Sequence, residues 1–75
     1  SYKEARELEA LPQQIAALEA EQAQLTQQLA DPALYRDGPG RAQALQRRYG
    51  EVEAELTRCL TRWEALETRR QDAAG

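Results

Sequence analysis

The feature that most constrains this chain is a strict heptad pattern of apolar residues between residues 45 and 66. Its members, spaced alternately by four and three residues, are Leu45, Tyr49, Val52, Leu56, Cys59, Trp63 and Leu66. This spacing is typical of helices that pack along a continuous seam, whereas a strand would alternate at every second residue. Because a lone helix cannot bury such a stripe, the pattern predicts a partner helix.

A matching stripe lies earlier in the same chain. It consists of Leu8, Leu11, Ile15, Leu18, Gln22, Leu25 and Leu29. If the chain folds back on itself, the last residue of the first stripe faces the first residue of the second, and the match holds at all seven positions. The sequence therefore predicts an all-α fold, an antiparallel two-helix coiled-coil hairpin. A parallel homodimer of extended chains is the competing arrangement, and the intervening Gly-Pro-Gly sequence disfavours it.

The chain is predicted to be one domain over residues 1–75, with helices at about 2–30 and 41–70 and a tip at 31–40. Ser1 followed by Glu4 has the spacing of a helix capping box. Pro12 predicts a kink or short break at Ala10–Leu11, because proline removes a backbone hydrogen bond from a helix interior. The tail at 71–75 is expected to fray.

The tip should contain a single helical turn at 32–36, because an aspartate followed by proline suits a cap and first turn. Leu34 and Tyr35 are expected to fold over the end of the seam, with a contact role for Tyr35 as the alternative. Asp37 is expected to cap the second helix. A glycine-rich phosphate loop at 37–40 is rejected, since it lacks the lysine and hydroxyl residues of that motif.

Two seam residues leave alternatives open. Gln22 either fixes the register of the helices or turns its amide outward. Cys59 is interpreted as a small apolar seam residue, with a redox or metal role as the alternative. No metal is expected, because one cysteine and no histidine cannot build the usual zinc-ligand patterns.

The net charge of −3 hides an uneven distribution. Residues 1–35 carry two basic and six acidic side chains, whereas residues 36–75 carry eight basic and seven acidic ones. Nine of the ten basic residues are arginine, whose planar guanidinium suits phosphate contacts. An acidic protein can therefore still present a basic stripe.

The candidate nucleic-acid-binding residues follow one side of the second helix and its tip. They are Arg36, Arg41, Arg47, Arg48, Arg58, Arg62 and Arg69. The residues that flank the two stripes can be paired on the assumption that each lies opposite the residue directly across the hairpin. This pairing places Glu7 opposite Arg69 and Glu21 opposite Glu55. It sets Arg48 and Arg62 opposite glutamines, which predicts that the hairpin leaves them unpaired. Two interpretations remain open, a surface that tracks a phosphate backbone and a solvated helical face.

Catalysis is not expected, because the chain has no histidine and no nucleophile–base set. It also lacks an apolar run long enough for a membrane span and a signal-peptide pattern. Since the chain begins without methionine, it is expected to be part of a longer protein whose localisation it shares.

Three segments together resemble a known family. The opening SYKEARELEALP (1–12), the turn ADPALY (30–35) and the closing RWEALE (62–67) are similar to the C-terminal domain of Uup-type ABC-F ATPases. The resemblance implies a cytoplasmic parent with two ATP-binding cassettes, with ATP bound there and no cofactor in this domain. It also implies a coiled coil associated with nucleic acid, DNA favoured over RNA, and no membrane partner.

The alternative function is a structural arm that docks on the ATPase cassettes or on the ribosome. On that interpretation apolar or acidic patches would matter more than the arginines. The resemblance also implies a lysine-rich linker before the domain, which would hold part of any affinity for nucleic acid. In either case the hairpin is expected to be monomeric.

Overall fold

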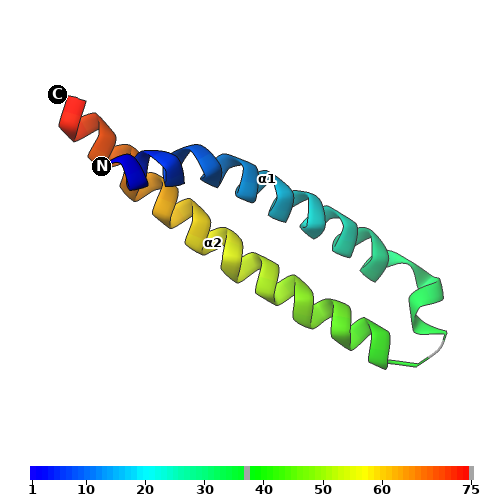
Figure 1. The fold of residues 1–75 in the computed structure, drawn as a ribbon. Helices are drawn as coiled ribbons and strands as arrows, with labels where there is room; N and C mark the ends of the chain where they lie inside the picture. Colours follow the sequence, from blue (N-terminus) through cyan, green and yellow to red (C-terminus); the bar gives the residue numbers. More distant parts are fainter. Residues whose placement is uncertain (37, 75) are drawn as a thin grey trace.

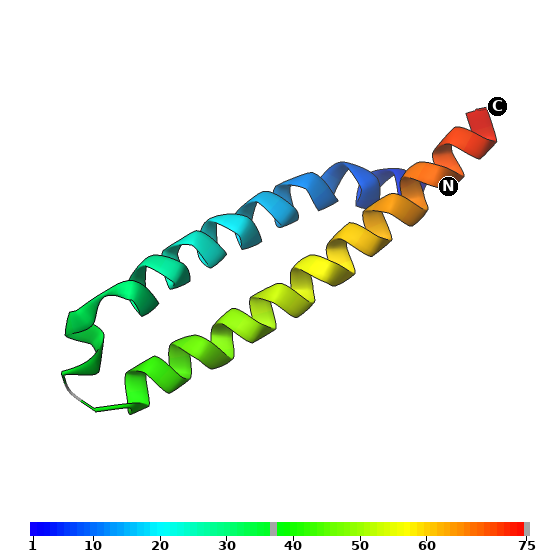
Figure 2. The same cartoon turned by 180° about the vertical axis from the view of Figure 1, so that it is seen from behind.

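The computed structural model, which describes residues 1–36 and 38–74, is an antiparallel pair of long helices (Figure 1). Helix α1 spans Tyr2–Ala30, a 3-10 turn η1 spans Pro32–Tyr35, and helix α2 spans Gly40–Ala74. The rod measures 58 × 17 × 14 Å. The start of α1 and the end of α2 share one end, here called the open end, and η1 lies at the opposite tip (Figures 1 and 2). The predicted all-α hairpin is confirmed.

One row of side chains between the two helices forms the core. Leu25, Val52 and Leu56 are buried, and the partly buried residues packed against them are Ile15, Leu18, Leu45 and Tyr49. Val52 is fully buried, at 0% exposure. Ala42, one step beyond Leu45 in the stripe, is also buried, although its small side chain was not counted in the sequence pattern. The core is therefore the predicted seam, extended by one position toward the tip.

Gln22 is a polar residue of this seam that finds a partner on the opposite helix. Its side-chain Nε2 donates a hydrogen bond to the hydroxyl of Tyr49 at 3.5 Å. A half-buried amide without a partner would cost free energy, and this contact satisfies one of its donors. Of the two alternatives, the structure favours an inward role in the seam over a purely outward amide.

Ser1 begins α1 as a helix cap. Its Oγ accepts a hydrogen bond from the backbone N–H of Glu4 at 3.2 Å, which satisfies one of the free donors of the first turn. The Glu4 carboxylate is directed instead to Arg69 of α2, at 2.9 Å. The predicted capping box is therefore only half formed, because an ion pair across the hairpin has taken the glutamate.

Pro12 lies inside α1, which continues through it as one helix. Of the two alternatives predicted at Ala10–Leu11, a kink or a short break, the continuity of α1 excludes the break. Leu11 is buried, at 5% exposure, and its packing against α2 holds the turn before the proline in place. The ribbon changes direction in these first turns (Figures 1 and 2), as expected where a proline ring crowds the preceding turn.

The tip closes one end of the seam. Asp31 caps η1, its Oδ1 accepting from the backbone N–H of Ala33 at 3.0 Å. Leu34 is buried as predicted, but Tyr35 is 52% exposed and only its hydroxyl returns to the rod, donating to the Leu29 carbonyl at 2.8 Å. The expectation that Tyr35 packs over the seam is thus wrong, because its polar end binds the free carbonyl of α1.

The reversal into α2 uses glycine in a backbone conformation that other residues rarely adopt. Gly38 has a φ of 97°, and the carbonyl of Pro39 accepts the first helical hydrogen bond, from Gln43, at 2.9 Å. The predicted capping role of Asp37 lies outside the described residues. At its other end α2 continues to Ala74, beyond the predicted limit at Arg70, since residues 71–74 include no helix breaker.

Two leucines of α2 test whether the seam holds the fold together. Leu56 is 9% exposed and Leu60, one turn later, is 45% exposed. We expect Leu56→Ala to lower the free energy of unfolding by about 2–5 kcal/mol, as for other buried leucines. The matched control Leu60→Ala should cost roughly 0.5 kcal/mol. Urea unfolding followed by circular dichroism measures both, and equal losses would show that the stripe is not the core.

Candidate nucleic-acid interface

Arg48 does not project freely from the rod, contrary to the prediction. Its Nε donates to Glu21 Oε2 at 2.6 Å and its Nη2 donates to Glu21 Oε1 at 2.8 Å. Its Nη1 also lies 3.5 Å from Glu51 and 3.7 Å from Glu55. The Arg48 guanidinium therefore forms a two-point bond across the hairpin within a local cluster of carboxylates.

Arg62 repeats this arrangement two heptads further along α2. Its Nε and Nη2 donate to the two carboxylate oxygens of Glu7, at 2.7 and 3.0 Å. Arg62 follows Arg48 by fourteen residues, and Glu21 follows Glu7 by the same number. We call these two bidentate pairs the clasps, because each ties α1 to α2 beside the seam.

Arg69 completes the set of arginines bound across the hairpin. It donates from Nη1 to Glu4 Oε2 at 2.9 Å. Its predicted partner was Glu7, which Arg62 occupies. The neighbouring Arg70 pairs along its own helix with Glu67.

The predicted pairing of the residues that flank the stripes is therefore wrong, and it is wrong in the same way for Arg48 and Arg62. It assumed that each side chain meets the residue straight across, which left Arg48 and Arg62 facing glutamines. An arginine side chain is long enough to reach a position one heptad away, and a carboxylate binds guanidinium far better than a neutral amide does. Both arginines accordingly reach diagonally to glutamate. The sequence contained the signal, since the two glutamates and the two arginines share one spacing.

The clasps change the acid–base properties of their members. Hydrogen bonds from Arg62 and Arg48 lower the pKa values of Glu7 and Glu21, despite partial desolvation of the carboxyls. The same bonds raise the pKa values of both arginines. Each clasp therefore favours the ionised form of both partners, as expected for a two-point charged hydrogen bond.

The other four candidate arginines have a different environment. Within residues 1–36 and 38–74, Arg36, Arg41, Arg47 and Arg58 take part in none of the ion pairs. All four are exposed. Arg36 follows η1, while Arg41 and Arg47 lie in the first turns of α2, so these three form what we call the basic tip. The structure thus divides the seven predicted arginines into three that are bound and four that are available.

No competing chemistry is evident in the part of the chain that the structure describes. It contains no group of three or more Cys, Asp or Glu residues arranged to hold a metal ion. Cys59 is a half-buried free thiol whose Sγ lies 4.0 Å from Gln14 Oε1. Neither described helix combines the length and apolarity needed to cross a membrane.

Comparison with known proteins places this hairpin in a family. Residues 1–68 match the ABC transporter C-terminal domain, and the chain belongs to that family. All 75 residues align with an ATP-binding protein Uup-like from Haemophilus influenzae at 40% identity, and with an ATP-binding protein Uup of the same organism at 39%. The chain spans 16% and 12% of these two relatives. No solved structure matches it. The chain is thus a C-terminal domain and not the ATP-binding cassette.

The clasps predict a specific dependence of stability on pH. Because the folded-state pKa values of Glu7 and Glu21 are lowered, their contribution is present above the ordinary value of 4.5 and is lost as the pH falls through the lowered values. At neutral pH the Glu7→Gln/Glu21→Gln variant should have a lower Tm than the wild type. That difference should shrink as the pH falls through the lowered pKa values of the two carboxyl groups.

Thermal unfolding at a series of pH values measures this effect. The matched control is Glu9→Gln/Glu19→Gln, which removes two exposed carboxylates of α1 that form none of the ion pairs among the described residues. Its Tm should stay close to that of the wild type at every pH. A difference between the clasp variant and the wild type that does not vary with pH would contradict the assignment.

Proposed function

We propose that this domain binds nucleic acid through sequence-independent contacts to phosphates, as an accessory of an ATP-binding protein. The observation that carries the proposal is the basic tip, a group of arginines on an acidic chain that form none of the ion pairs among residues 1–36 and 38–74. Arginine is well suited to such contacts because its guanidinium forms two parallel hydrogen bonds with a phosphate. The resemblance to Uup-type proteins favours DNA over RNA.

The spacing of the available arginines suits a phosphate backbone. Arg41 and Arg47 are separated by a rise of about 9 Å along α2, and Arg58 lies roughly 17 Å further along the helix. Phosphate charges on one strand of duplex DNA recur about every 3.4 Å along the axis. The tip can therefore span several phosphates, with Arg58 as an outlying contact on the side of the rod.

The clasped arginines have a different role in this proposal. For Arg48 or Arg62 to bind phosphate, it would first have to release a glutamate held by two hydrogen bonds. That exchange gains little, because one charged hydrogen-bonded pair replaces another. We therefore assign Arg48, Arg62 and Arg69 to hairpin stability, and we place the nucleic-acid contacts at Arg36, Arg41, Arg47 and Arg58.

The parent protein provides the setting for this activity. Its relatives carry the name ATP-binding protein, and a C-terminal domain of this size would be a small part of such a chain. We propose that ATP binds elsewhere in the parent, that the parent works in the cytoplasm without a membrane partner, and that the hairpin itself is monomeric.

Removing the basic tip should weaken binding to all sequences alike. The Arg36→Gln/Arg41→Gln/Arg47→Gln variant should lower the slope of log affinity against log salt by about 3 for duplex DNA, since each phosphate contact contributes about 0.9. The matched control, Lys3→Gln/Arg6→Gln/Arg70→Gln, removes the same charge at the open end and should keep most of the slope. Fluorescence anisotropy of labelled duplex at several salt concentrations measures both.

Two outcomes would contradict this proposal. Equal losses in the two variants would show that net charge, rather than the tip, determines binding. An absence of binding even at low salt would favour the alternative of an interaction arm.

A further inference from the structure

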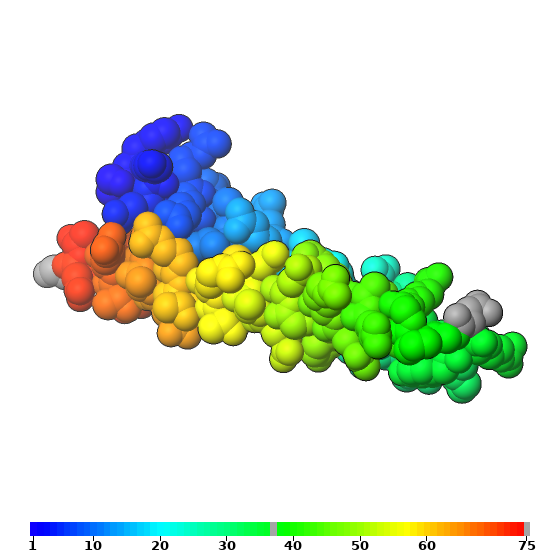
Figure 3. Space-filling view, turned by 90° about the horizontal axis from the view of Figure 1, so that it is seen from below, coloured from blue at the N-terminus to red at the C-terminus, as the bar shows by residue number. Residues whose placement is uncertain are grey.

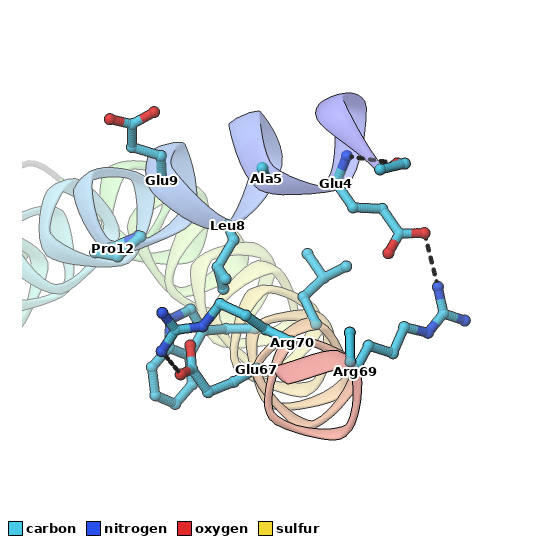
Figure 4. A pocket seen from close by; sticks show the side chains of 12 residues that line it. Glu4, Ala5, Leu8, Glu9, Pro12, Glu67, Arg69 and Arg70 are labelled. Carbon is cyan, nitrogen blue, oxygen red and sulfur yellow. Dashed lines mark hydrogen bonds and ion pairs between the residues drawn. The ribbon is translucent and has the colours of Figure 1, made fainter. Parts of the chain in front are cut away.

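The open end of the rod contains an apolar groove that the seam does not fill. It has a volume of about 700 Å³ and is lined by the first turns of α1 and the last turns of α2. Leu8, Pro12, Trp63 and Leu66 supply its large apolar side chains, and Leu8 points from α1 toward α2 (Figure 4). Pockets that bind small molecules measure about 300–1,000 Å³, so this groove can accommodate a large side chain.

The groove exists because the helices separate where α1 changes direction. Figure 3 shows the first turns of α1 standing off the rod beside the last turns of α2. Leu8 and Trp63 are partly exposed, as most residues of the seam are, whereas Leu66 beside them is buried. Contiguous apolar surface with a polar rim is one mark of an interaction site.

Of the charged side chains that line the groove, four are paired with one another, whereas Glu9 forms none of the ion pairs among the described residues and points away from α2 (Figure 4). Glu4 binds Arg69 at 2.9 Å, and Glu67 binds Arg70 (Figure 4). These four side chains therefore present little uncompensated charge to an incoming group. Recognition in this groove must depend mainly on apolar contact, which distinguishes it from the basic tip.

The position of the groove identifies its occupant. The family is a C-terminal domain, and the matched region is only 16% and 12% of the two relatives. In a parent of that kind the ATP-binding part precedes the C-terminal domain, and Ser1, the N-cap of α1, lines the groove. A tethered neighbour has an effective concentration that reaches about the millimolar range, far above that of a second copy in dilute solution.

We propose that the groove docks a large aliphatic or aromatic side chain from the ATP-binding part of the same polypeptide. This contact sets the direction of the rod, whose tip then projects by much of its 58 Å length. The proposal does not depend on nucleic-acid binding, since it concerns the opposite end of the hairpin.

Two substitutions in the full-length parent test the proposal from opposite sides of the groove. Ala5→Glu and Ala73→Lys each place a charge at an exposed alanine that lines it. Their matched controls, Ala16→Glu and Ala65→Lys, make the same changes at exposed alanines of the same helices that do not line the groove. Hydrogen–deuterium exchange is compared across the whole parent protein.

Both groove variants should speed exchange in one common segment of the ATP-binding part, by about tenfold if the effective concentration exceeds the intramolecular Kd by that factor. The controls should leave that segment unchanged, and all four variants should keep wild-type exchange in the middle of α2. No change in the ATP-binding part would overturn the proposal. A change that depends on protein concentration, with a doubled mass by light scattering, would overturn it in favour of a second copy.

Discussion

The burial of a single apolar seam between two helices is the interaction on which the rest of this molecule depends. A rod 17 by 14 Å in cross-section has no second layer, so only side chains facing the opposite helix can leave water. Val52 alone reaches 0% exposure, and most other seam residues stay partly exposed. Small domains bury a limited share of their surface, and here the constraint is extreme. Contacts beside the seam therefore matter more than they would in a thicker fold.

The arginines of α2 illustrate this constraint. On a large protein, an exposed ion pair contributes little and its arginine is free to serve a ligand. Here the clasps join the two helices at two points fourteen residues apart, where they reinforce the pairing that the seam requires. Charge used in this way is less available for a partner. The arginines proposed for binding are accordingly those of the basic tip and Arg58, which form none of the ion pairs among the described residues.

The hairpin could be predicted from the sequence because helix geometry determines the spacing at which buried residues recur along the chain. A spacing of three and four residues can only place those side chains on one helical face, and two complementary stripes specify a fold-back. The extension of α2 from Arg70 to Ala74 was not predicted, because the absence of a helix breaker in residues 71–74 outweighed the expectation that the tail frays. Tyr35 was misplaced because one hydroxyl bond to a free carbonyl decided its orientation.

The candidate site was harder to predict for a physical reason. Position along a helix predicted that Arg48, Arg58, Arg62 and Arg69 share one side of the rod, and Arg36, Arg41 and Arg47 were added as candidates because they lie toward the tip. It does not give the direction in which a long flexible side chain reaches. Arg48 and Arg62 could each lie over a neutral glutamine or extend to a glutamate, and only the three-dimensional structure decides between them. A stripe of like residues is therefore a weaker signal of function than a stripe of apolar residues is of structure.

The two ends of the rod differ chemically, and the seam explains how they can be related. The tip presents arginines, whereas the open end presents an apolar groove whose rim includes the ion pairs Glu4–Arg69 and Glu67–Arg70. The helices between them are continuous and held in register by the seam and the clasps. A rigid rod of this kind does not transmit a local change of shape along its length, but a change in its orientation moves the far end. A small rotation at the open end displaces the tip through a long lever arm. Control of the tip by the rest of a parent protein would therefore act through the orientation of the hairpin, with its internal structure unchanged.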